Sequence, residues 1–273
     1  MKKIYIYGRG EISIRLKEII NERKKGMSIV NDIHESDFIF LTNNEDKNDS
    51  FINENQKLIS EKIIIDFSSY FKKREVGKYI LDYLFINNCS NIKGKDIISL
   101  PACYASSVII PIQFLEKIFN VRGSEISIIS IGGKSTIGKN KDLTSGSLRF
   151  SSSKSEDYHL NEIKKHTYKF DNVFFKLLVG DLKEGILSII NIKCSETNLK
   201  NDLEVVLDLK KEEFVVKNTQ IDSMENISNN NEEISKFWVK YNASNSSYDI
   251  YSYVNNLNLP IELALKYVEG FEK

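Results

Sequence analysis

Cys103 is the residue of this sequence best placed for covalent chemistry. It lies in SLPACYASS (99–107), where Pro101 ends an apolar segment and a long apolar run follows. A thiol at the first turn of a helix faces the positive end of the helix dipole, which favours the nucleophilic thiolate. A lone cysteine is more often a small packing residue, and we read Cys89 and Cys194 in that way.

A nucleophilic cysteine needs an acid–base partner, and histidine is the commonest one in enzymes. The chain contains three histidines, His34, His159 and His166. His34 lies in a polar loop between two predicted strands, whereas His159 and His166 share a face if their segment is helical. Metal ligation needs closer spacing and more ligands, so we expect no metal site. Exposure to solvent is the alternative reading of His166.

The turn after the first predicted strand contains Gly8, Gly10 and Ser13 and leads into a helix. A dinucleotide-binding fold holds a pyrophosphate against backbone amides at this point. Two glycines are a weak signal, and a tight turn without a ligand explains them equally well. Both readings are consistent with the sequence.

Two further loops carry hydroxyl groups and lysines that suit an anion. GGKSTIGK (132–139) follows a predicted strand but lacks the spacing of a phosphate-binding P-loop. DFSSYFKK (66–73) also follows a strand and contains Ser68 and Lys72. Ammonium groups and backbone amides in these loops could hold a phosphate or a carboxylate. A solvated loop is the alternative at 66–73.

The segments that must position these residues change character along the chain. Residues 1–102 alternate short apolar strands with helices, which is typical of a parallel sheet buried on both faces. Residues 124–254 contain longer β runs with little helix between them, which indicates a second, mostly antiparallel sheet. A closing helix is predicted at 258–273. The first half is expected to contain strands at 3–8, 27–30, 37–42, 62–68 and 96–101, and helices at 11–26, within 43–59 and from 103.

The composition excludes several classes of partner. Lysine plus arginine number 38 and aspartate plus glutamate also number 38, so the net charge of zero gives no general attraction to nucleic acid or to an anionic membrane. We expect no membrane segment, because no apolar stretch reaches the ~18 residues that a membrane helix needs. MKKIYIYGRG does not resemble a signal peptide, and three cysteines without metal-like spacing favour a reducing cytoplasm.

Taken in order, several segments resemble the N-acetyl-gamma-glutamyl-phosphate reductase family of the semialdehyde dehydrogenase superfamily. LPACYAS is similar to the family's Pro-Gly-Cys-Tyr-x-Thr, and IDFSSYFKK to its Asp-x-Ser-Ala-Asp-Phe-Arg. SIGGKSTIGK resembles a Ser-Gly-x-Ser-Gly-x-Gly-Lys loop, YHLNEIKKH a His-x-Pro-Glu-Ile segment, and EGIL an Arg-Gly-Ile-Leu segment. VNNLNLPIELAL resembles the C-terminal Asp-Asn-Leu-x-Lys-Gly-Ala stretch. These segments span nearly the whole chain.

The resemblance implies an α/β fold with a Rossmann-like dinucleotide-binding domain and an α+β domain with a mostly antiparallel sheet. Residues 1–102 and 256–273 would form the dinucleotide-binding domain. Residues 103–255 would form the catalytic, substrate-binding and dimerisation domain. The resemblance also implies a homodimer or a homotetramer.

The same resemblance implies a reaction, the NADPH-dependent reduction of N-acetyl-gamma-glutamyl phosphate to N-acetylglutamate semialdehyde in arginine biosynthesis. Cys103 would attack the acyl phosphate, phosphate would leave, and hydride would reduce the thioester while His159 handles the protons. The implied substrate- and phosphate-binding residues are Ser68, Lys72, Ser135, Lys139 and Glu162. The implied NADP(H)-binding residues are Gly8, Gly10, Ser13, Ser68 and Asn256.

Several positions depart from the family pattern. The departures are Ala102 for glycine, Asn161 for proline, Lys72 and Glu184 for arginine, and 259–261 for Lys-Gly-Ala. The chain is also shorter than is usual for the family. One alternative is therefore a non-catalytic relative that keeps the fold as a binding or assembly protein. Another is a lysine-pathway reductase that acts on an aminoadipyl phosphate, which a carrier protein could present.

Overall fold

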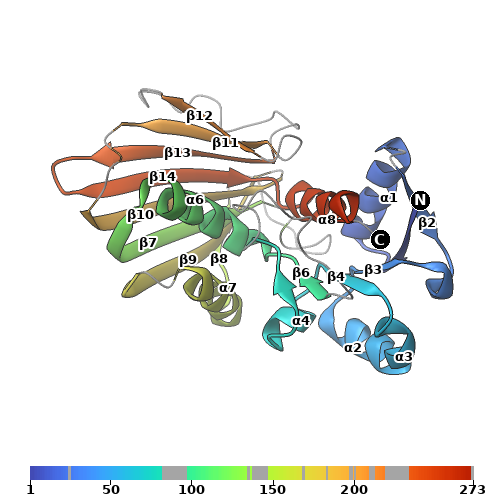
Figure 1. Ribbon diagram of the computed structural model, residues 1–273. Helices are drawn as coiled ribbons and strands as arrows, with labels where there is room; N and C mark the ends of the chain where they lie inside the picture. The colour runs from blue at the N-terminus through green and yellow to red at the C-terminus, as the bar shows by residue number, and fades with distance from the viewer. Residues whose placement is uncertain are drawn as a thin grey trace. The chain divides into compact units, whose positions relative to one another are not determined.

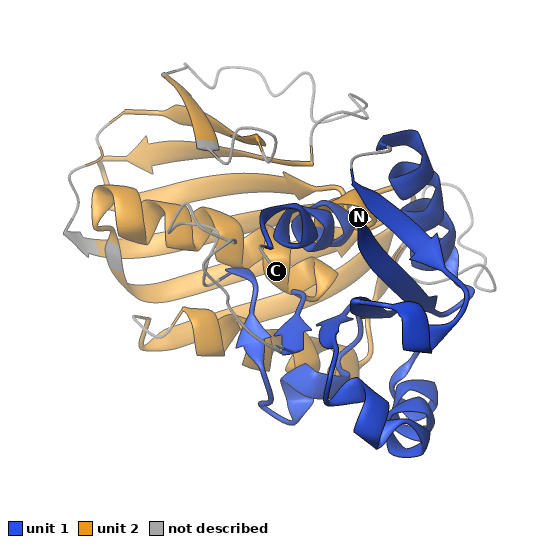
Figure 2. Ribbon diagram, turned by 45° about the vertical axis from the view of Figure 1, so that its right-hand side comes forward, with its two compact units in different colours: residues 1–101, 260–273 blue, residues 102–259 orange. Residues whose placement is uncertain are grey.

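The chain forms two compact units, shown in Figure 1 and coloured separately in Figure 2. The computed structural model describes residues 1–23, 26–81, 97–133, 136, 147–167, 170–182, 184–196, 199, 201–208, 213–218 and 234–271. Unit 1 contains Met1–Pro101 and Pro260–Lys273, and unit 2 contains Ala102–Leu259. The chain thus leaves unit 1 once, builds unit 2 as one continuous segment, and then returns to unit 1.

Unit 1 is built on a six-stranded parallel sheet with the strand order β2-β1-β3-β4-β6-β5. Its elements are β1 (Lys2–Tyr7), α1 (Glu11–Arg23), β2 (Met27–Val30), η1 (Ile33–Glu35), β3 (Phe38–Leu41), α2 (Glu45–Glu54), α3 (Gln56–Ile59), β4 (Ile63–Asp66), α4 (Tyr70–Lys73), β5 (Lys78–Tyr79), β6 (Ile97–Ser99) and α8 (Asn258–Gly270). The strand order changes direction between β1 and β3. Open α/β sheets bind ligands at such a switch point, outside the carboxyl ends of the strands.

The central strands of this sheet are buried on both faces, as their unbroken apolar sequences predict. All four residues of β3 and all four of β4 are buried. Ile39 and Leu41 pack with Phe51 of α2 on one face of the sheet. Phe38 points to the other face, where its ring meets Phe271 edge-on at a centroid distance of 5.5 Å. The predicted parallel sheet is therefore confirmed.

The connection from β2 to β3 is much shorter than a parallel crossover usually requires. It consists of residues 31–37 and contains only the short helix η1, whereas such crossovers usually take about a dozen residues or more. The registers explain why this link suffices, because Val30 pairs with Tyr5 and Phe38 pairs with the adjacent Ile4. After β2, the chain therefore does not have to run back to the start of β1 before β3 begins. The connection needs no long helix.

Helix α8 completes the core of unit 1. Ile261 and Leu265 are fully buried. The ammonium group of Lys2 donates to the carbonyl oxygens of Val268 at 2.6 Å and Glu269 at 2.8 Å. An ammonium group at this position donates to the last carbonyl groups of the helix, and its positive charge interacts favourably with the negative end of the helix dipole. The first strand and the closing helix are therefore joined directly.

Unit 2 is built on an eight-stranded sheet with the order β12-β11-β13-β14-β10-β7-β9-β8. Its elements are α6 (Cys103–Phe119), β7 (Arg122–Gly132), β8 (Leu148–Phe150), α7 (Ser153–His166), β9 (Asn172–Gly180), β10 (Ile186–Glu196), β11 (Leu203–Asp208), β12 (Glu213–Asn218), β13 (Ser235–Asn242) and β14 (Ser247–Val254). Only the β7–β9 pair is parallel among the described neighbours, which confirms the mostly antiparallel sheet. Helix α6 packs on this sheet against β10, β14 and β7 (Figure 1). In the described part of the chain, no helix has the length and apolar character needed to span a membrane.

Candidate active site

Cys103 occupies the first helical position of α6, as the sequence predicts. Ala102, with φ of −66° and ψ of 146°, is the extended N-cap residue, and the helix continues for 17 residues. Cys103 is partly exposed and carries a thiol rather than a disulfide. The thiol therefore lies at the positive end of a long helix dipole, within reach of solvent.

Helix α7 holds the residues on both sides of Cys103. The N–H group of Ala102 donates to Glu162 Oε1 at 3.0 Å. The ring of Tyr104 meets the ring of His159 edge-on, at a centroid distance of 5.0 Å. His159 and Glu162 are three residues apart, so they lie on one face of α7. The structure thus brings both of these predicted site residues to the start of the helix that carries Cys103.

Glu162 caps helix α6 from another element. The N-cap residue Ala102 has no side-chain hydrogen bond of its own, and its N–H group is bound by the Glu162 carboxylate instead. A carboxylate near a helix N-terminus is also favoured by the helix dipole. Glu162 therefore stabilises the turn that presents Cys103. Its contact with substrate or phosphate stays a prediction.

Tyr104 links the start of α6 to the turn after β7. Its hydroxyl lies 3.1 Å from Thr136 Oγ1, and Thr136 Oγ1 donates to the carbonyl oxygen of Gly133 at 2.7 Å. Burial raises the pKa of Tyr104 to about 12, so the phenol is protonated at neutral pH. Because the single hydroxyl proton of Thr136 goes to the Gly133 carbonyl, the Tyr104 hydroxyl is the donor in its hydrogen bond with Thr136.

The predicted anion-binding loop at 132–139 begins at this turn. The structure describes its residues 132, 133 and 136. Gly132 lies so close to Tyr104 that a Cβ atom at this position would overlap the phenol. Ser135 and Lys139 lie outside the described residues, so their contacts with phosphate stay predictions.

Asn256 is joined to the same turn. Its Oδ1 atom accepts the N–H group of Gly185 at 3.1 Å, and the Gly185 carbonyl accepts the N–H group of Gly133 at 2.9 Å. Gly185 has φ of 87°, a conformation that glycine adopts without strain. Asn256, predicted to bind the cofactor, is thus hydrogen-bonded to the turn that Tyr104 contacts.

Three buried serines, which the sequence analysis did not single out, lie beneath the first turn of α6. Ser107 donates to the carbonyl oxygen of Tyr104 at 2.8 Å, and Ser188 lies 2.6 Å from the hydroxyls of both Ser107 and Ser130. All three hydroxyls are satisfied if Ser130 donates to Ser188 and Ser188 to Ser107. A single serine at an inward position of an apolar strand, as in IISIG (128–132) and ILSII (186–190), is the sequence signal for such a series of hydrogen bonds.

The carboxyl ends of β1, β2 and β3 in unit 1 surround a cavity of about 510 Å³. Its lining includes Gly8 from the turn after β1 and Asn31 from the end of β2. It also includes three cationic side chains, those of Arg9, Lys17 and Lys47, and no carboxylate among the described residues. The cavity lies at the switch point of the sheet, and its charge and size suit a phosphate-bearing ligand.

The three residues predicted for the cofactor turn have different surroundings. Gly8, with φ of 154°, lines the cavity, and a Cβ atom there would overlap Thr42 Oγ1. Ser13 is buried, and its hydroxyl lies 2.7 Å from Thr42 Oγ1, so it holds α1 against the end of β3. Gly10 is exposed, and a Cβ atom there would have nothing within 4 Å. Of these three, Gly8 is therefore the residue that contacts the cavity.

We expect Gly8→Ala to lower the free energy of unfolding by about 1–3 kcal/mol. The backbone conformation of residue 8 is strained for alanine, and the new methyl group would lie too close to Thr42. Gly10→Ala is the matched control, since it makes the same chemical change two residues away in open space. Its effect should stay within about 0.5 kcal/mol. Urea unfolding measures both values, and equal losses in the two variants would contradict the close packing at Gly8.

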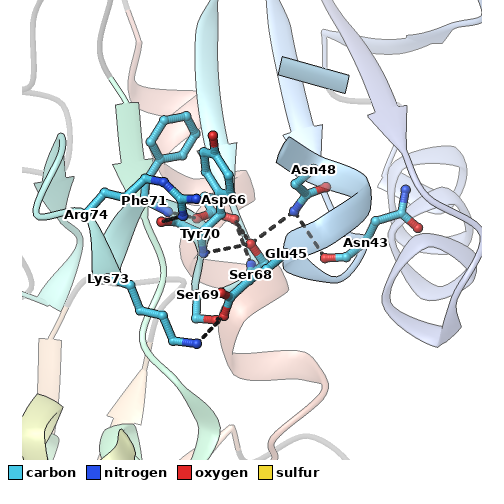
Figure 3. Close-up of polar contacts among 10 residues, drawn as sticks. All are labelled: Asn43, Glu45, Asn48, Asp66, Ser68, Ser69, Tyr70, Phe71, Lys73 and Arg74. Atoms are coloured by element: carbon cyan, nitrogen blue, oxygen red, sulfur yellow. Dashed lines mark hydrogen bonds and ion pairs between the residues drawn. The ribbon is translucent and has the colours of Figure 1, made fainter. Parts of the chain in front are cut away.

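Figure 3 shows Ser68 in the loop after β4, among polar partners that all belong to unit 1. Its hydroxyl donates to Asp66 Oδ1 at 2.5 Å and accepts from Asn48 Nδ2 at 3.0 Å and from the N–H group of Tyr70 at 3.1 Å. A serine hydroxyl has one donor and two acceptor sites, so all three are used within the protein. Ser68 therefore stabilises this loop, and its contacts with substrate and cofactor stay predictions.

Lys72 lies in α4 and is partly exposed. Like Ser68, it belongs to unit 1, whereas Cys103 and His159 belong to unit 2. The contact of Lys72 with substrate also stays a prediction.

No protein-family model matches the chain. Two curated proteins resemble it in sequence, the N-acetyl-gamma-glutamyl-phosphate reductases of Caldicellulosiruptor bescii and Caldicellulosiruptor saccharolyticus. They are 28% and 26% identical to it over 181 residues, which are 57% of this chain and 53% of each relative. The match therefore spans about half the length of these curated relatives.

Solved structures resemble the chain over almost its whole length. Aspartate semialdehyde dehydrogenase II of Vibrio cholerae, complexed with ASA, has a TM-score of 0.67 and 12% identity, covering 99% of this chain and 98% of its own. A probable aspartate-semialdehyde dehydrogenase from Pseudomonas aeruginosa has a TM-score of 0.70 and 10% identity, covering 99% and 97%. The Candida albicans enzyme with NADP has a TM-score of 0.69 and 10% identity, covering 99% and 98%. The chain therefore has the semialdehyde dehydrogenase fold, and its resemblance in sequence to N-acetyl-gamma-glutamyl-phosphate reductase is confirmed at low identity.

Proposed function

We propose that the chain is an oxidoreductase that reduces N-acetyl-gamma-glutamyl phosphate to N-acetylglutamate semialdehyde with NADPH and releases phosphate, as in arginine biosynthesis. The observation that carries this proposal is the position of Cys103 at the start of α6, between two residues that contact His159 and Glu162 of α7. The names of the two curated relatives support the acyl-phosphate substrate. The fold supports the class of reaction.

Cys103 is the nucleophile of the proposed reaction. Its thiolate attacks the acyl carbon, the bond from that carbon to the phosphate oxygen breaks, and phosphate leaves with the bonding electrons. When bound, NADPH supplies the hydride that reduces the resulting thioester. The carbon–sulfur bond then breaks, and Cys103 is released as the thiolate together with the aldehyde. The first N–H groups of α6, which lack partners within the helix, lie beside Cys103 and can stabilise the oxyanion.

His159 is the acid–base group of the proposed reaction. It takes the thiol proton to generate the attacking thiolate and passes that proton to the leaving phosphate. After the aldehyde is released, a proton from solvent returns Cys103 to the thiol. The imidazole is largely buried, with 7% of its surface exposed, and the ring of Tyr104 packs against it. A ring held in this way has a restricted orientation, which proton transfer at a defined atom requires.

The cavity of unit 1 favours NADP over NAD as the cofactor. NAD-binding sheets commonly place a carboxylate near the end of the second strand, where it binds the ribose 2′-hydroxyl. Here the residue that lines the cavity at that point is Asn31. The carboxylate of the next residue, Asp32, accepts the N–H group of His34 at 2.9 Å. Lys17 and Lys47 in the cavity lining can offset the charge of a phosphate.

The reverse reaction tests this function with stable reagents. The protein is given N-acetylglutamate semialdehyde, inorganic phosphate and NADP, and the absorbance of the reduced cofactor is followed. Parallel reactions with aspartate semialdehyde, with aminoadipate semialdehyde and with NAD identify the preferred substrate and cofactor. We expect turnover that requires phosphate and is fastest with the N-acetylglutamate compound and NADP. No turnover, under conditions where the Caldicellulosiruptor bescii reductase works, would refute the proposed reaction.

A further inference from the structure

A continuous series of hydrogen bonds leads from the residue after Cys103 to Asn256. The Tyr104 hydroxyl binds Thr136 Oγ1, and Thr136 Oγ1 binds the carbonyl oxygen of Gly133. The N–H group of Gly133 donates to the Gly185 carbonyl, and the N–H group of Gly185 donates to Asn256. The four bonds measure 3.1, 2.7, 2.9 and 3.1 Å, and every residue belongs to unit 2.

The residues of this series have little room to shift. A Cβ atom at Gly132 would overlap both Tyr104 and Thr136, and one at Gly185 would overlap the ring of Tyr253. Gly185 also has φ of 87°, so both its backbone conformation and its surroundings require glycine. The two turns can therefore keep their contacts only in a narrow range of positions.

The phenol at the start of the series is itself held in place. Tyr104 is 4% exposed, its ring packs against His159, and its backbone carbonyl accepts the hydroxyl of Ser107. Because its pKa is raised to about 12, the hydroxyl remains a donor throughout the pH range in which an enzyme of this kind is assayed. The Tyr104 side chain thus has a restricted position, and the turn after β7 is hydrogen-bonded to it through Thr136.

We propose that Tyr104 is a positioning residue, whose hydroxyl sets the turn after β7 and, through Gly133 and Gly185, the side chain of Asn256 relative to Cys103. This inference rests on the proposed function, together with the two roles that the family resemblance implies, phosphate binding by the 132–139 loop and cofactor binding by Asn256. The phenol itself is not proposed to touch either ligand. It acts by aligning the two groups that do.

Tyr104→Phe tests the inference, because it removes the hydroxyl and keeps the ring against His159. A single hydrogen bond of this kind changes binding by about three- to tenfold. We expect the KM values for inorganic phosphate and NADP in the reverse reaction to rise by about that factor, with kcat changed less than about twofold. Unchanged KM values would overturn the inference.

Thr136 and Tyr251 provide the matched variants. Thr136→Val should raise the same KM values as Tyr104→Phe, whereas Thr136→Ser keeps a hydroxyl at this position and should restore them. Tyr251→Phe is the control for loss of a phenol hydroxyl, because Tyr251 pairs with the exposed Ile189 in the sheet. Equal effects of Tyr104→Phe and Tyr251→Phe would contradict a specific role of Tyr104.

Amide hydrogen exchange provides a readout that needs no activity. The N–H groups of Gly133 and Gly185 are both hydrogen-bonded in the series, so their exchange should be faster in Tyr104→Phe than in the wild type and unchanged in Tyr251→Phe. Wild-type protein without turnover would refute the proposed function, and the exchange rates alone would then decide whether the phenol holds the two turns. Unchanged exchange at both glycines would overturn the inference in either case.

Discussion

The Cys103→Ser variant is expected to lose turnover by about a thousandfold or more, because the proposed nucleophile is the thiolate and a serine hydroxyl stays protonated at neutral pH. The substitution leaves the size of the side chain almost unchanged. It also keeps the hydrogen bond of Ala102 to Glu162 and the contact of Tyr104 with His159, which do not involve the sulfur. The thermal unfolding midpoint should therefore match that of the wild type. The reverse reaction measures the loss of turnover.

Cys194→Ala is the matched control for the loss of a thiol. Cys194 is buried in β10, and burial raises its pKa to about 12. Its sulfur lies 3.7 Å from the carbonyl oxygen of Ile192 in the same strand. This strand is far from α6 in the sequence. We expect this variant to keep wild-type turnover. Retained turnover in Cys103→Ser would show that Cys103 is not the nucleophile, whereas loss in both variants would indicate general damage to the fold.

Replacing His159 by glutamine is expected to reduce kcat by about 10²–10⁴-fold, the usual contribution of a general acid–base group. Glutamine can form hydrogen bonds but cannot accept the thiol proton at neutral pH. The buried position of His159 makes some loss of stability unavoidable, so the folded fraction has to be measured beside the rate. Thermal unfolding followed by circular dichroism gives that fraction, and the reverse reaction gives kcat.

His166→Gln is the control within the same helix. His166 lies two turns after His159 in α7, in the last turn, and is only partly buried. Its side chain lies at the end of the helix and is not fully buried, so its replacement should affect stability slightly and kcat hardly at all. If His159→Gln and His166→Gln lower kcat to the same extent, His159 has no special part in the reaction.

The sequence predicts most of the fold because the strands of both sheets are strongly apolar. The FIFL strand and the three isoleucines of the IIID strand are apolar runs, and the structure buries them together with Asp66, which ends β4. The start of α6 is predicted as well, because Pro101 precedes it and a long apolar run follows. Two strands of unit 2 are missed. β8 (Leu148–Phe150) has three residues, all exposed, and β11 (Leu203–Asp208) is apolar at every second residue but lies among charged side chains.

The site can be predicted only in part, because the hydrogen-bond partners of its hydroxyl groups are distant in the sequence and are brought close only by the tertiary fold. Ser13 and Ser68 follow strands, where a ligand-binding role is the natural interpretation of the sequence. The structure shows Ser13 bonded to Thr42, 29 residues away, and Ser68 bonded to Asn48, 20 residues away. Neither partner can be identified from the local sequence. Cys103, His159 and Glu162 could be predicted as a set only because their motifs have a recognisable order.

The return of the chain to unit 1 through α8 has a consequence for the order of events during protein synthesis. Residues 102–259 form one continuous unit, so they can fold as soon as they have left the ribosome. Unit 1 cannot complete its core until α8 has also emerged, because the ion pair of Arg23 with Glu262 and the contact of Phe38 with Phe271 involve residues that follow unit 2. Unit 1, whose first segment precedes unit 2 in the chain, is thus the last to complete its core. Until α8 emerges, the apolar surface of unit 1 that α8 covers stays exposed in the nascent chain and is prone to aggregation.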